Sequence, residues 1–443
     1  MEAFFTKYQV FLATAISLFA YVVLGYFFER EQFYWLLFLY SVAFLGMILL
    51  IKTQEYEKVF FKIGVLYRVL FLFSIPALSQ DFYRFIWDGH TILAGLNPYQ
   101  FRPDTIINTL ATFPNAHFLY QKMGSLSAAH FSNYPPINQL FFVIASFVGG
   151  KSILVSTIIL RLTIILADIG IYHFGRKILN HFEINTENIF WYFLNPLVIL
   201  ECTGNLHFEV VMLFFFVVGL YYLIQNKWMI AAVLIGLSIS VKLLPLLLLP
   251  LFFTHLGFKK SVLFYSIIIG LNVLFFLPFL NVTLVDNYFE TIALWFTNFE
   301  FNASIYYLVR EIGFYIKGYN IIHTIGKITP ILTILMILFF AFGRKNKSVE
   351  LILINSLLVL SIYLFISTTV HPWYLINVLL LSVFTKYKFP IAWSFLIILS
   401  YFAYSVQPFK ENMYFLFIEY MIVFCLFFYE VFYLPIREQN MVK

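Results

Sequence analysis

The sequence predicts an all-α polytopic membrane protein, and two observations carry this prediction. Of the 443 residues, 62% are hydrophobic and only 11% are charged, whereas a soluble globular chain carries about 25% charged residues. The hydrophobic residues also fall into runs that can cross a bilayer, which takes roughly 20 apolar residues per helix. With the polar connections set aside, the chain has room for a bundle of about 12–14 transmembrane helices.

The apolar runs follow one another along the chain with one long interruption, between residues 80 and 136. They lie near residues 8–28, 33–51, 59–79, 137–149, 152–174, 187–202, 205–224, 228–253, 260–281, 319–343, 348–367, 370–385, 388–405 and 412–433. Only Thr203 and Gly204 separate the runs 187–202 and 205–224, so this pair is either one broken helix or a short hairpin. The first run lacks a small-residue cleavage site, which favours a first span over a cleaved signal peptide.

Charge and cysteine content exclude several other classes of protein. The net charge of +6 comes from Lys and Arg in loops, which suits contact with anionic lipid headgroups and does not indicate nucleic-acid binding. Cys202 and Cys425 both lie in apolar surroundings. Neither a disulfide framework nor a cysteine metal site is therefore expected.

Loop Lys and Arg residues predict the orientation, because such residues concentrate on the cytoplasmic side. With Lys7 inside, Lys52, Lys259 and Lys345 also fall inside, whereas Arg176 falls outside and opposes the assignment. We expect a multi-pass protein of the plasma (inner) membrane on this basis.

This orientation places three polar segments on the extracytoplasmic side. They are residues 80–136, the segment after Leu280 and the corner Thr369–His371. A polar segment as long as 80–136 is more often functional than idle in a compact protein. We therefore expect the three segments to share one functional cavity.

The segment 80–136 is predicted to be an extracytoplasmic loop that carries two short interfacial helices. The first runs from Gln80 to Ala94, with Gly95 as its C-terminal glycine. Asp81, Arg84 and Asp88 then lie on one helical face, at positions i, i+3 and i+7.

Asp81 has two readings. As a carboxylate where the third run meets the outer face, it can act as a general base toward an acceptor hydroxyl. Alternatively it caps the helix, because Asp is a preferred N-cap residue. Asp88 is either a second functional carboxylate or the ion-pair partner of Arg84, and the pair is favoured.

The motif His371-Pro-Trp-Tyr374 begins a run on the same face. An imidazole beside Trp373 and Tyr374 suits contact with phosphate and sugar. The alternative is an aromatic belt at the membrane interface.

Two further polar groups interrupt apolar runs. Glu201, His207 and Glu209 lie between two runs and form either a metal site or, as we favour, the polar hinge of a broken helix. Lys242 lies inside an apolar run, where it either snorkels to the interface or meets a lipid phosphate as a compact cation.

No Walker sequence, Rossmann fingerprint or other Gly-rich nucleotide loop occurs in the chain. A donor delivered through the membrane is therefore easier to accept than a soluble nucleotide donor.

The motifs also have a recognisable order. They are Asp81, Tyr83-Arg84, Gly95-Leu-Asn-Pro-Tyr99, Tyr134-Pro-Pro136, Asn195-Pro-Leu197, Gly204-Asn-Leu-His-Phe-Glu209, Lys242-Leu-Leu-Pro245 and His371-Pro-Trp-Tyr374. In this order they resemble the GT-C superfamily of polyprenol-phosphate-sugar-dependent glycosyltransferases, and within it the bacterial membrane mannosyltransferases. They are also similar to the mannosyltransferase that adds the first mannose of GPI anchors.

The resemblance covers residues 59–385 of a single transmembrane domain over 1–443. It leaves two extra N-terminal spans in 1–58 and C-terminal spans in 386–443. The resemblance implies an inverting transfer of a sugar, mannose by preference, from a polyprenyl phosphate to a lipid-linked or glycan acceptor.

The resemblance also implies roles for single residues. The essential acid of the first outer loop matches Asp81, and the late histidine that contacts the donor phosphate matches His371. An inverting transfer needs one base and groups that hold the leaving phosphate. The remaining candidates for donor or substrate binding are Arg84, Lys242, Asp88, Tyr374, Glu201 and His207.

The GPI relative carries a paired Asp-x-Asp where this chain has Ser79-Gln80-Asp81. Only the second acid is present, so we expect no metal and no other cofactor.

Two rival functions fit a membrane protein with a large outer loop. A lipid-linked oligosaccharide flippase or other transporter would show a midplane polar path and often inverted repeats, and no repeat is visible. A polysaccharide polymerase would be favoured by a basic outer loop. Here the loop is balanced, with Arg84, Arg102 and Lys122 against Asp81, Asp88 and Asp104.

Overall fold

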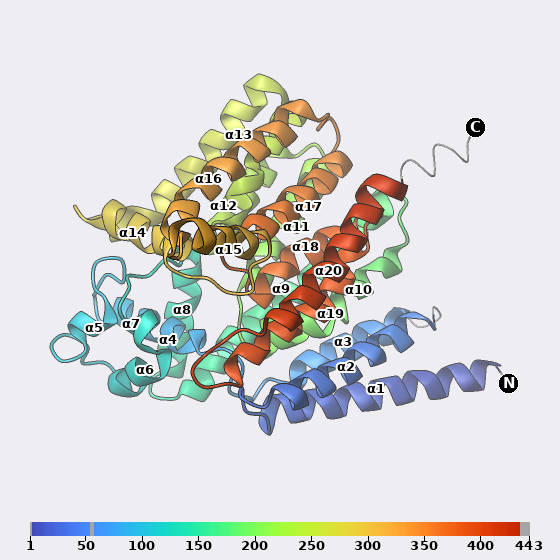
Figure 1. The fold of residues 1–443 in the computed structure, drawn as a ribbon, viewed down its shortest axis with the longest axis horizontal. Coiled ribbons are helices and arrows are strands. Elements are labelled where there is room, and N and C mark those ends of the chain that lie inside the picture. Colours follow the sequence, from blue (N-terminus) through green and yellow to red (C-terminus); the bar gives the residue numbers. More distant parts are fainter. Residues whose placement is uncertain (1, 54–56, 435–443) are drawn as a thin grey trace.

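Helices account for nearly all of the regular structure in the computed structural model, which describes residues 2–53 and 57–434 (Figure 1). Within these ranges the only strand-like feature is an isolated parallel bridge between Phe301 and Thr369. The predicted all-α class is therefore confirmed. Residues 435–443, the end of the expected C-terminal module, lie outside the described residues.

The first half of the chain contains the loop helices and the break. Its helices are α1 (Glu2–Tyr26), α2 (Phe33–Ile51), α3 (Glu57–Leu70), α4 (Asp81–Leu93), α5 (Pro103–Ile106), α6 (Ala116–Met123), α7 (Ser125–Ala128), α8 (Pro136–Gly149), α9 (Ile153–His181), η1 (Thr186–Ile189), α10 (Phe190–Phe193), η2 (Val198–Gly204) and α11 (Glu209–Ile224).

The second half consists mostly of long apolar helices. They are α12 (Trp228–Val241), η3 (Leu244–Phe252), α13 (Phe253–Phe276), η4 (Leu277–Phe279), α14 (Leu284–Thr297), α15 (Ile305–Lys317), α16 (Ile322–Leu338), η5 (Phe339–Gly343), α17 (Val349–Ile366), η6 (Pro372–Tyr374), α18 (Leu375–Val383), α19 (Phe389–Leu396), η7 (Ile397–Tyr404), α20 (Met413–Phe428) and η8 (Tyr429–Tyr433).

Seven helices of the described residues are long and apolar enough to cross a membrane, or up to eight if the bent pair η2 and α11 is one span. Four shorter apolar helices, Pro136–Gly149, Trp228–Val241, Pro372–Val383 and Phe389–Tyr404, occupy other predicted runs. The expected 12–14 spans therefore exceed the seven or eight described helices that are long enough to cross a membrane. The chain is a multi-pass membrane protein.

One buried arginine shapes two irregular stretches of backbone. Arg161 of α9 donates from Nη1 to the carbonyls of Leu72 (3.0 Å) and Ser74 (2.8 Å). It also donates from Nε to the carbonyl of Thr203 (2.7 Å) and from Nη2 to that of Gly204 (3.1 Å). Backbone inside a bilayer can leave the helical form only where the protein satisfies its polar groups.

The two breaks differ in how well the sequence predicts them. The helix of the predicted run 59–79 ends at Leu70, nine residues early. Pro76 disfavours a helix in the residues before it, and Arg161 satisfies the carbonyls of Leu72 and Ser74 in the irregular stretch that follows. The break between 187–202 and 205–224 was expected, and η2 and α11 meet there at 109°.

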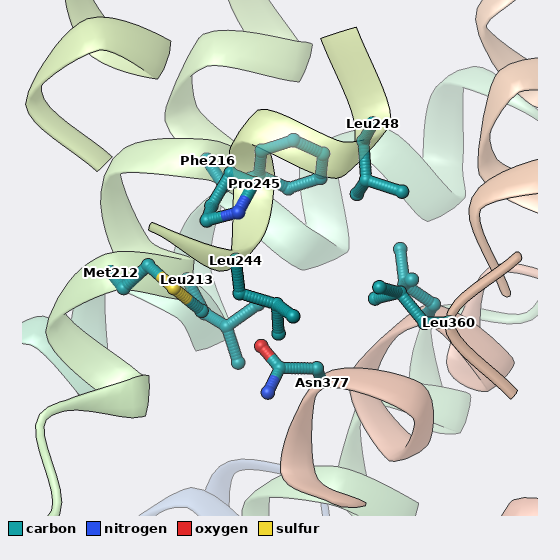
Figure 2. A pocket seen from close by; sticks show the side chains of 9 residues that line it. Met212, Leu213, Phe216, Leu244, Pro245, Leu248, Leu360 and Asn377 are labelled. Carbon is teal, nitrogen blue, oxygen red and sulfur yellow. The ribbon is translucent and has the colours of Figure 1, made fainter. Parts of the chain in front are cut away.

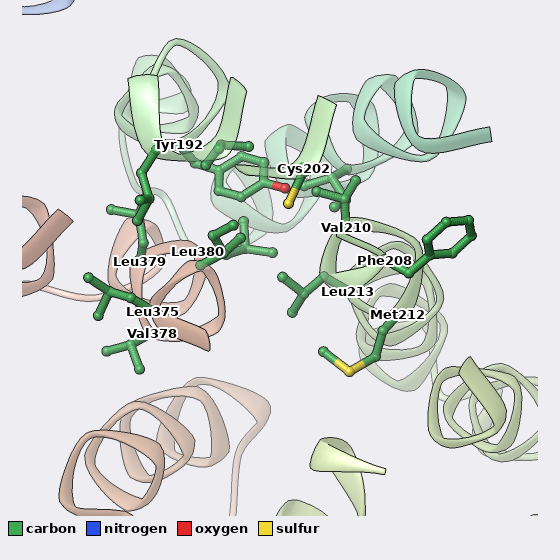
Figure 3. Packing of buried hydrophobic residues seen from close by; sticks show 14 of the residues in the cluster. Tyr192, Cys202, Phe208, Val210, Met212, Leu213, Leu375, Val378, Leu379 and Leu380 are labelled. Atoms are coloured by element: carbon green, nitrogen blue, oxygen red, sulfur yellow. The ribbon is translucent and has the colours of Figure 1, made fainter. Parts of the chain in front are cut away.

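The core lies where α10, η2, α11 and α18 meet (Figure 3). Tyr192, Cys202, Leu213 and Leu379 are almost fully buried in it. Beside this core, Arg68 Nε lies 2.5 Å from Asp168 Oδ2, and both side chains are fully buried.

The segment 80–136 forms four short helices, α4 to α7, rather than the expected two. They gather on one side of the molecule, away from the N-terminus (Figure 1). Helix α4 packs closely on α8 at Gly89, where a Cβ atom would lie 2.3 Å from the carbonyl oxygen of Phe142. The predicted helix Gln80–Ala94 corresponds to α4, and Gly95 follows it with a positive φ of 76°.

Candidate active site

Asp81 is the first residue of α4, and its carboxylate is not used by the helix. The N-cap position belongs to Gln80, whose side chain makes no capping bond but donates to the carbonyl of Met123 in α6 (3.1 Å). The Asp81 N–H donates to Ser79 Oγ (3.2 Å), and its carboxylate has no hydrogen-bond partner among the described residues. The N-cap reading of Asp81 is therefore wrong.

The charged groups around Asp81 come from other elements. The Lys242 and Arg30 cations and the Glu209 carboxylate all act electrostatically on the Asp81 carboxyl. Burial raises the pKa of Asp81 above its ordinary value, and the two cations oppose this rise. Asp81 is thus a partly buried, unpaired acid whose basicity is increased.

Arg84 and Asp88 form the ion pair that the sequence favoured. Arg84 Nε lies 2.7 Å from Asp88 Oδ1, and both side chains are almost completely buried. Arg84 Nη1 also donates to the carbonyls of Ser127 and His130, the latter at 3.0 Å, so the pair fastens α7 to α4.

The break between η2 and α11 brings Glu201 and His207 together. His207 Nε2 lies 3.6 Å from Glu201 Oε2, and the hydroxyl of Tyr401 donates to Glu201 Oε1 (2.6 Å). Asn205 ties the break to the start of the loop, since its Oδ1 accepts from the Leu78 N–H (3.1 Å). All three residues of the predicted hinge, Glu201, His207 and Glu209, are buried within the protein.

Lys242 is paired within the protein rather than extended toward a headgroup. Its Nζ lies 2.5 Å from Oε1 of Glu209, the first residue of α11. The second oxygen of Glu209 is buried without a hydrogen bond in the described part of the chain. Lys242 is one of the two cations that act electrostatically on Asp81. Glu209 balances much of the Lys242 charge.

Two imidazoles stack on Trp373. The His371 ring centre lies 4.3 Å from that of Trp373, at 8° between planes, and the His207 ring centre lies 3.7 Å away at 16°. Tyr374 meets His371 edge-on at 5.4 Å. Trp373 and Tyr374 remain partly exposed, so an aromatic surface lies beside the buried histidines.

A backbone bridge fixes the corner that carries His371. The Phe301 N–H donates to Thr368 (3.1 Å), and the Val370 N–H donates to Phe301 (2.8 Å). Burial lowers the pKa of His371, with smaller effects in the same direction from Arg30 and Lys242, so the imidazole is neutral at pH 7. Its Nδ1 is buried and has no hydrogen-bond partner among the described residues.

Arg30, in the turn between α1 and α2, is the site residue that sequence reasoning missed. Its guanidinium carbon lies 3.3 Å from the centre of the Tyr404 ring. The charge of Arg30 acts on Asp81, His371 and Glu201. The available signal was its place at the outer end of the first predicted hairpin, on the same side as Asp81.

The donor set does not suggest a metal centre. In residues 2–53 and 57–434, no three His, Cys, Asp or Glu side chains gather closely enough to hold a metal ion. Glu201 and His207 meet, but they lack a third ligand.

A separate pocket lies between α11, η3, α17 and α18 (Figure 2). Its lining is apolar except for Asn377, whose Nδ2 donates to the carbonyl of Tyr374 (2.9 Å). Such a lining offers few hydrogen bonds to a sugar, so we place the candidate site at Asp81 instead.

Comparison with known proteins confirms the resemblance to membrane mannosyltransferases. A family described as "Alpha-(1->6)-mannopyranosyltransferase, N-terminal domain" matches residues 11–257, which is more than half of the chain. The match begins inside α1 and includes both N-terminal spans. Alpha-(1->6)-mannopyranosyltransferase A of Mycobacterium tuberculosis is 25% identical over 175 residues, which cover 39% of this chain and 32% of that protein. The matched region thus spans about a third of that relative's length.

Proposed function

Because the chain belongs to the alpha-(1->6)-mannopyranosyltransferase family, we propose that it moves mannose from a polyprenyl-phosphate donor to a hydroxyl of a lipid-linked or glycan acceptor. The family assignment makes it a multi-pass membrane glycosyltransferase that acts on a sugar donor and an acceptor. The donor class, the inverting course and the extracytoplasmic site are our proposal. A single transmembrane domain carries the whole reaction.

The observation that carries the proposal is the free carboxylate of Asp81. It is partly buried, its pKa is raised by burial, and the charges of Lys242 and Arg30 act on it. A general base must lie within about 2.6–3.2 Å of the hydroxyl that it deprotonates. An acceptor hydroxyl beside Asp81 could therefore pass its proton to the free carboxylate. The positive charges of Lys242 and Arg30 would favour an anionic donor nearby.

The transfer needs one base and no acid. The acceptor oxygen attacks the anomeric carbon from the side opposite the phosphate, and its proton passes to Asp81. The bond between the anomeric carbon and the phosphate oxygen breaks, and its electron pair stays on the phosphate. One displacement at this carbon inverts its configuration, and the phosphate leaves without protonation.

Groups on other elements can hold the two substrates. Lys242 faces the same cluster as Asp81 and can contact the leaving phosphate. The neutral imidazole of His371 can donate one hydrogen bond. His207 and His371 cover the two faces of Trp373, so Trp373 can contact a sugar only through its partly exposed edge. Glu201 and His207 lie behind this surface and hold the break that positions Glu209.

The donor class is tested with purified protein in detergent and an acceptor lipid extract. We expect transfer of radiolabelled mannose from polyprenyl-phosphate-mannose and none from GDP-mannose. Transfer from the nucleotide sugar alone would contradict the proposed donor. Movement of the intact labelled lipid between leaflets, without transfer, would favour a flippase.

A further inference from the structure

We propose that Arg30 binds the phosphate of the lipid donor, so that the N-terminal hairpin α1–α2 completes the active site. This inference rests on the proposed polyprenyl-phosphate donor. It assigns a substrate-binding role to a residue that belongs to none of the motifs on which the resemblance depends.

The hairpin holds Arg30 in a fixed position. The end of α1 away from the N-terminus points toward the side of the molecule that carries α4 to α8 (Figure 1). Phe33, at the start of α2, packs on Phe402 and Phe415 with ring centres 5.3 and 5.5 Å apart. The hydroxyl of Tyr26 donates to the carbonyl of Leu70 (2.6 Å). The turn is thus fastened to η7, α20 and the end of α3.

The guanidinium of Arg30 keeps its hydrogen-bonding edge available. The guanidinium lies over the Tyr404 ring, with its central carbon 3.3 Å from the ring centre. Its Nε is buried and has no hydrogen-bond partner in the described part of the chain. A guanidinium carries five N–H donors in its plane, so contact through its face leaves these donors for a ligand.

Arg30 differs from the other cations near the candidate site because no acid among the described residues pairs with it. Lys242 is paired with Glu209, and Arg84 is paired with Asp88. Arg30 makes no ion pair within residues 2–53 and 57–434. Its charge nevertheless acts on Asp81 and His371, so it lies within electrostatic range of both residues.

A phosphate ester is the ligand that this arrangement fits. The planar donors of arginine match phosphate oxygens in pairs, and a partly buried cation without a counter-charge favours an anion. When the donor bond breaks, the leaving phosphate gains negative charge, which a fixed cation stabilises. The membrane position of the hairpin suits a phosphate that carries a lipid chain.

The test measures binding without catalysis, using full-length protein in detergent. Farnesyl monophosphate and farnesol are titrated separately, and binding is followed by intrinsic tryptophan fluorescence. We expect Arg30→Gln to weaken binding of farnesyl monophosphate by about 10- to 100-fold, as for loss of a charge-assisted contact. Farnesol binding should stay unchanged. Arg30→Lys should give a smaller loss, because it keeps the charge but not the paired donors.

Arg102→Gln is the matched control. It removes a positive charge from the same expected face, but Arg102 is 38% exposed and already paired with Asp104. It should leave farnesyl monophosphate binding unchanged. Equal losses for the phosphate and the alcohol in Arg30→Gln would show that Arg30 only supports the fold, and unchanged phosphate binding would also overturn the proposal. If Arg30→Gln does not fold, the comparison of Arg30→Lys with Arg102→Gln decides.

The same titrations distinguish an incorrect donor class from an incorrect role for Arg30. A wild-type protein that binds farnesyl monophosphate no better than farnesol would reject a lipid-phosphate donor, and with it this role for Arg30. A wild-type preference for the phosphate that survives in Arg30→Gln would reject Arg30 alone.

Discussion

At the scale of residues, Asp81 differs from the acids around it because its carboxylate has no hydrogen-bond or ion-pair partner in the described part of the chain. Asp88 is held by Arg84, Glu209 by Lys242 and Glu201 by the hydroxyl of Tyr401. A carboxylate that makes no hydrogen bond or ion pair within the fold can be replaced without loss of a polar contact. Asp81 is therefore the position where loss of chemistry and loss of stability separate most clearly.

We expect Asp81→Asn to abolish most mannosyl transfer and to keep the fold. Asparagine keeps the shape of the side chain but cannot accept the acceptor proton, and loss of a general base costs about 10²–10⁴-fold in rate. The single-turnover transfer rate and the thermal unfolding midpoint in detergent measure the two effects. The matched control is Asp104→Asn, in the same loop, where the acid is 31% exposed. Near-normal transfer by Asp81→Asn would remove Asp81 from the chemistry.

The pH dependence of the reaction should reflect Asp81 and not His371. Burial raises the Asp81 pKa, and the base is active when deprotonated, so activity should fall as the pH drops through a value above the ordinary aspartate pKa. Burial lowers the His371 pKa, so no step should occur near the usual imidazole value of about 6.5. The measurement is kcat/KM against pH. His371→Gln should weaken use of the donor but leave the acidic limb in place, and loss of a limb near the imidazole value in that variant would contradict this.

We also expect transfer to be independent of divalent cations. The Asp-x-Asp pair of the resembled enzymes is incomplete at Ser79-Gln80-Asp81, and Glu201 and His207 are not joined by a third ligand in the described residues. Activity should persist in excess EDTA and should not rise with added Mn²⁺ or Mg²⁺. Activity that disappears in EDTA and returns with Mn²⁺ would require a metal held partly by the donor.

At the scale of elements, the sequence predicts most of the helices but only one of the two breaks, the one between η2 and α11. Hydrophobic runs located most helices, and the spacing from Gln80 to Ala94 predicted α4 and the pairing of Arg84 with Asp88. The early end of α3 was missed, although Pro76 inside the predicted run already disfavours a helix there. The two hydrogen bonds that Arg161 donates to this stretch come from about 90 residues away, which local sequence does not show. Two of the four loop helices were likewise unpredicted, since short helices depend on tertiary packing more than on local propensity.

The Arg84–Asp88 pair should matter for stability more than for chemistry. Asp88→Asn leaves a buried guanidinium without its counter-charge, and breaking a buried pair in this way costs about 3–5 kcal/mol. We expect a lower unfolding midpoint and faster proteolysis near Ser127, whose carbonyl Arg84 holds. The folded fraction should still transfer mannose better than Asp81→Asn does. In the half-exposed Arg102–Asp104 pair, Asp104→Asn should change stability by less than about 1 kcal/mol. Equal destabilisation by both substitutions would contradict a special role for the buried pair.

At the scale of the whole molecule, the candidate site draws on five separate parts of the chain. Asp81 begins α4, Glu209 begins α11, Lys242 follows α12, His371 precedes η6, and Arg30 lies between α1 and α2. Motif order identified Asp81, Lys242 and His371 as candidates for the transfer. Sequence analysis did not identify Arg30, because a single arginine in a short turn forms no motif with neighbouring residues. Arg30 reaches the site only through the tertiary packing that places it on Tyr404.

The assembly of these parts predicts one orientation in the membrane. Thr105 is exposed in the loop that contains Asp81, and Lys345 is exposed between η5 and α17. The distribution of positive loop residues predicts Lys345 on the cytoplasmic side and Thr105 on the other side. In a Cys425→Ser background, which removes the exposed cysteine and leaves the buried Cys202, we expect Thr105→Cys to react with an impermeant maleimide in intact spheroplasts. Lys345→Cys should react only after lysis. The reverse pattern would move Asp81 to the cytoplasmic face, where a soluble nucleotide donor would become the better match to the site.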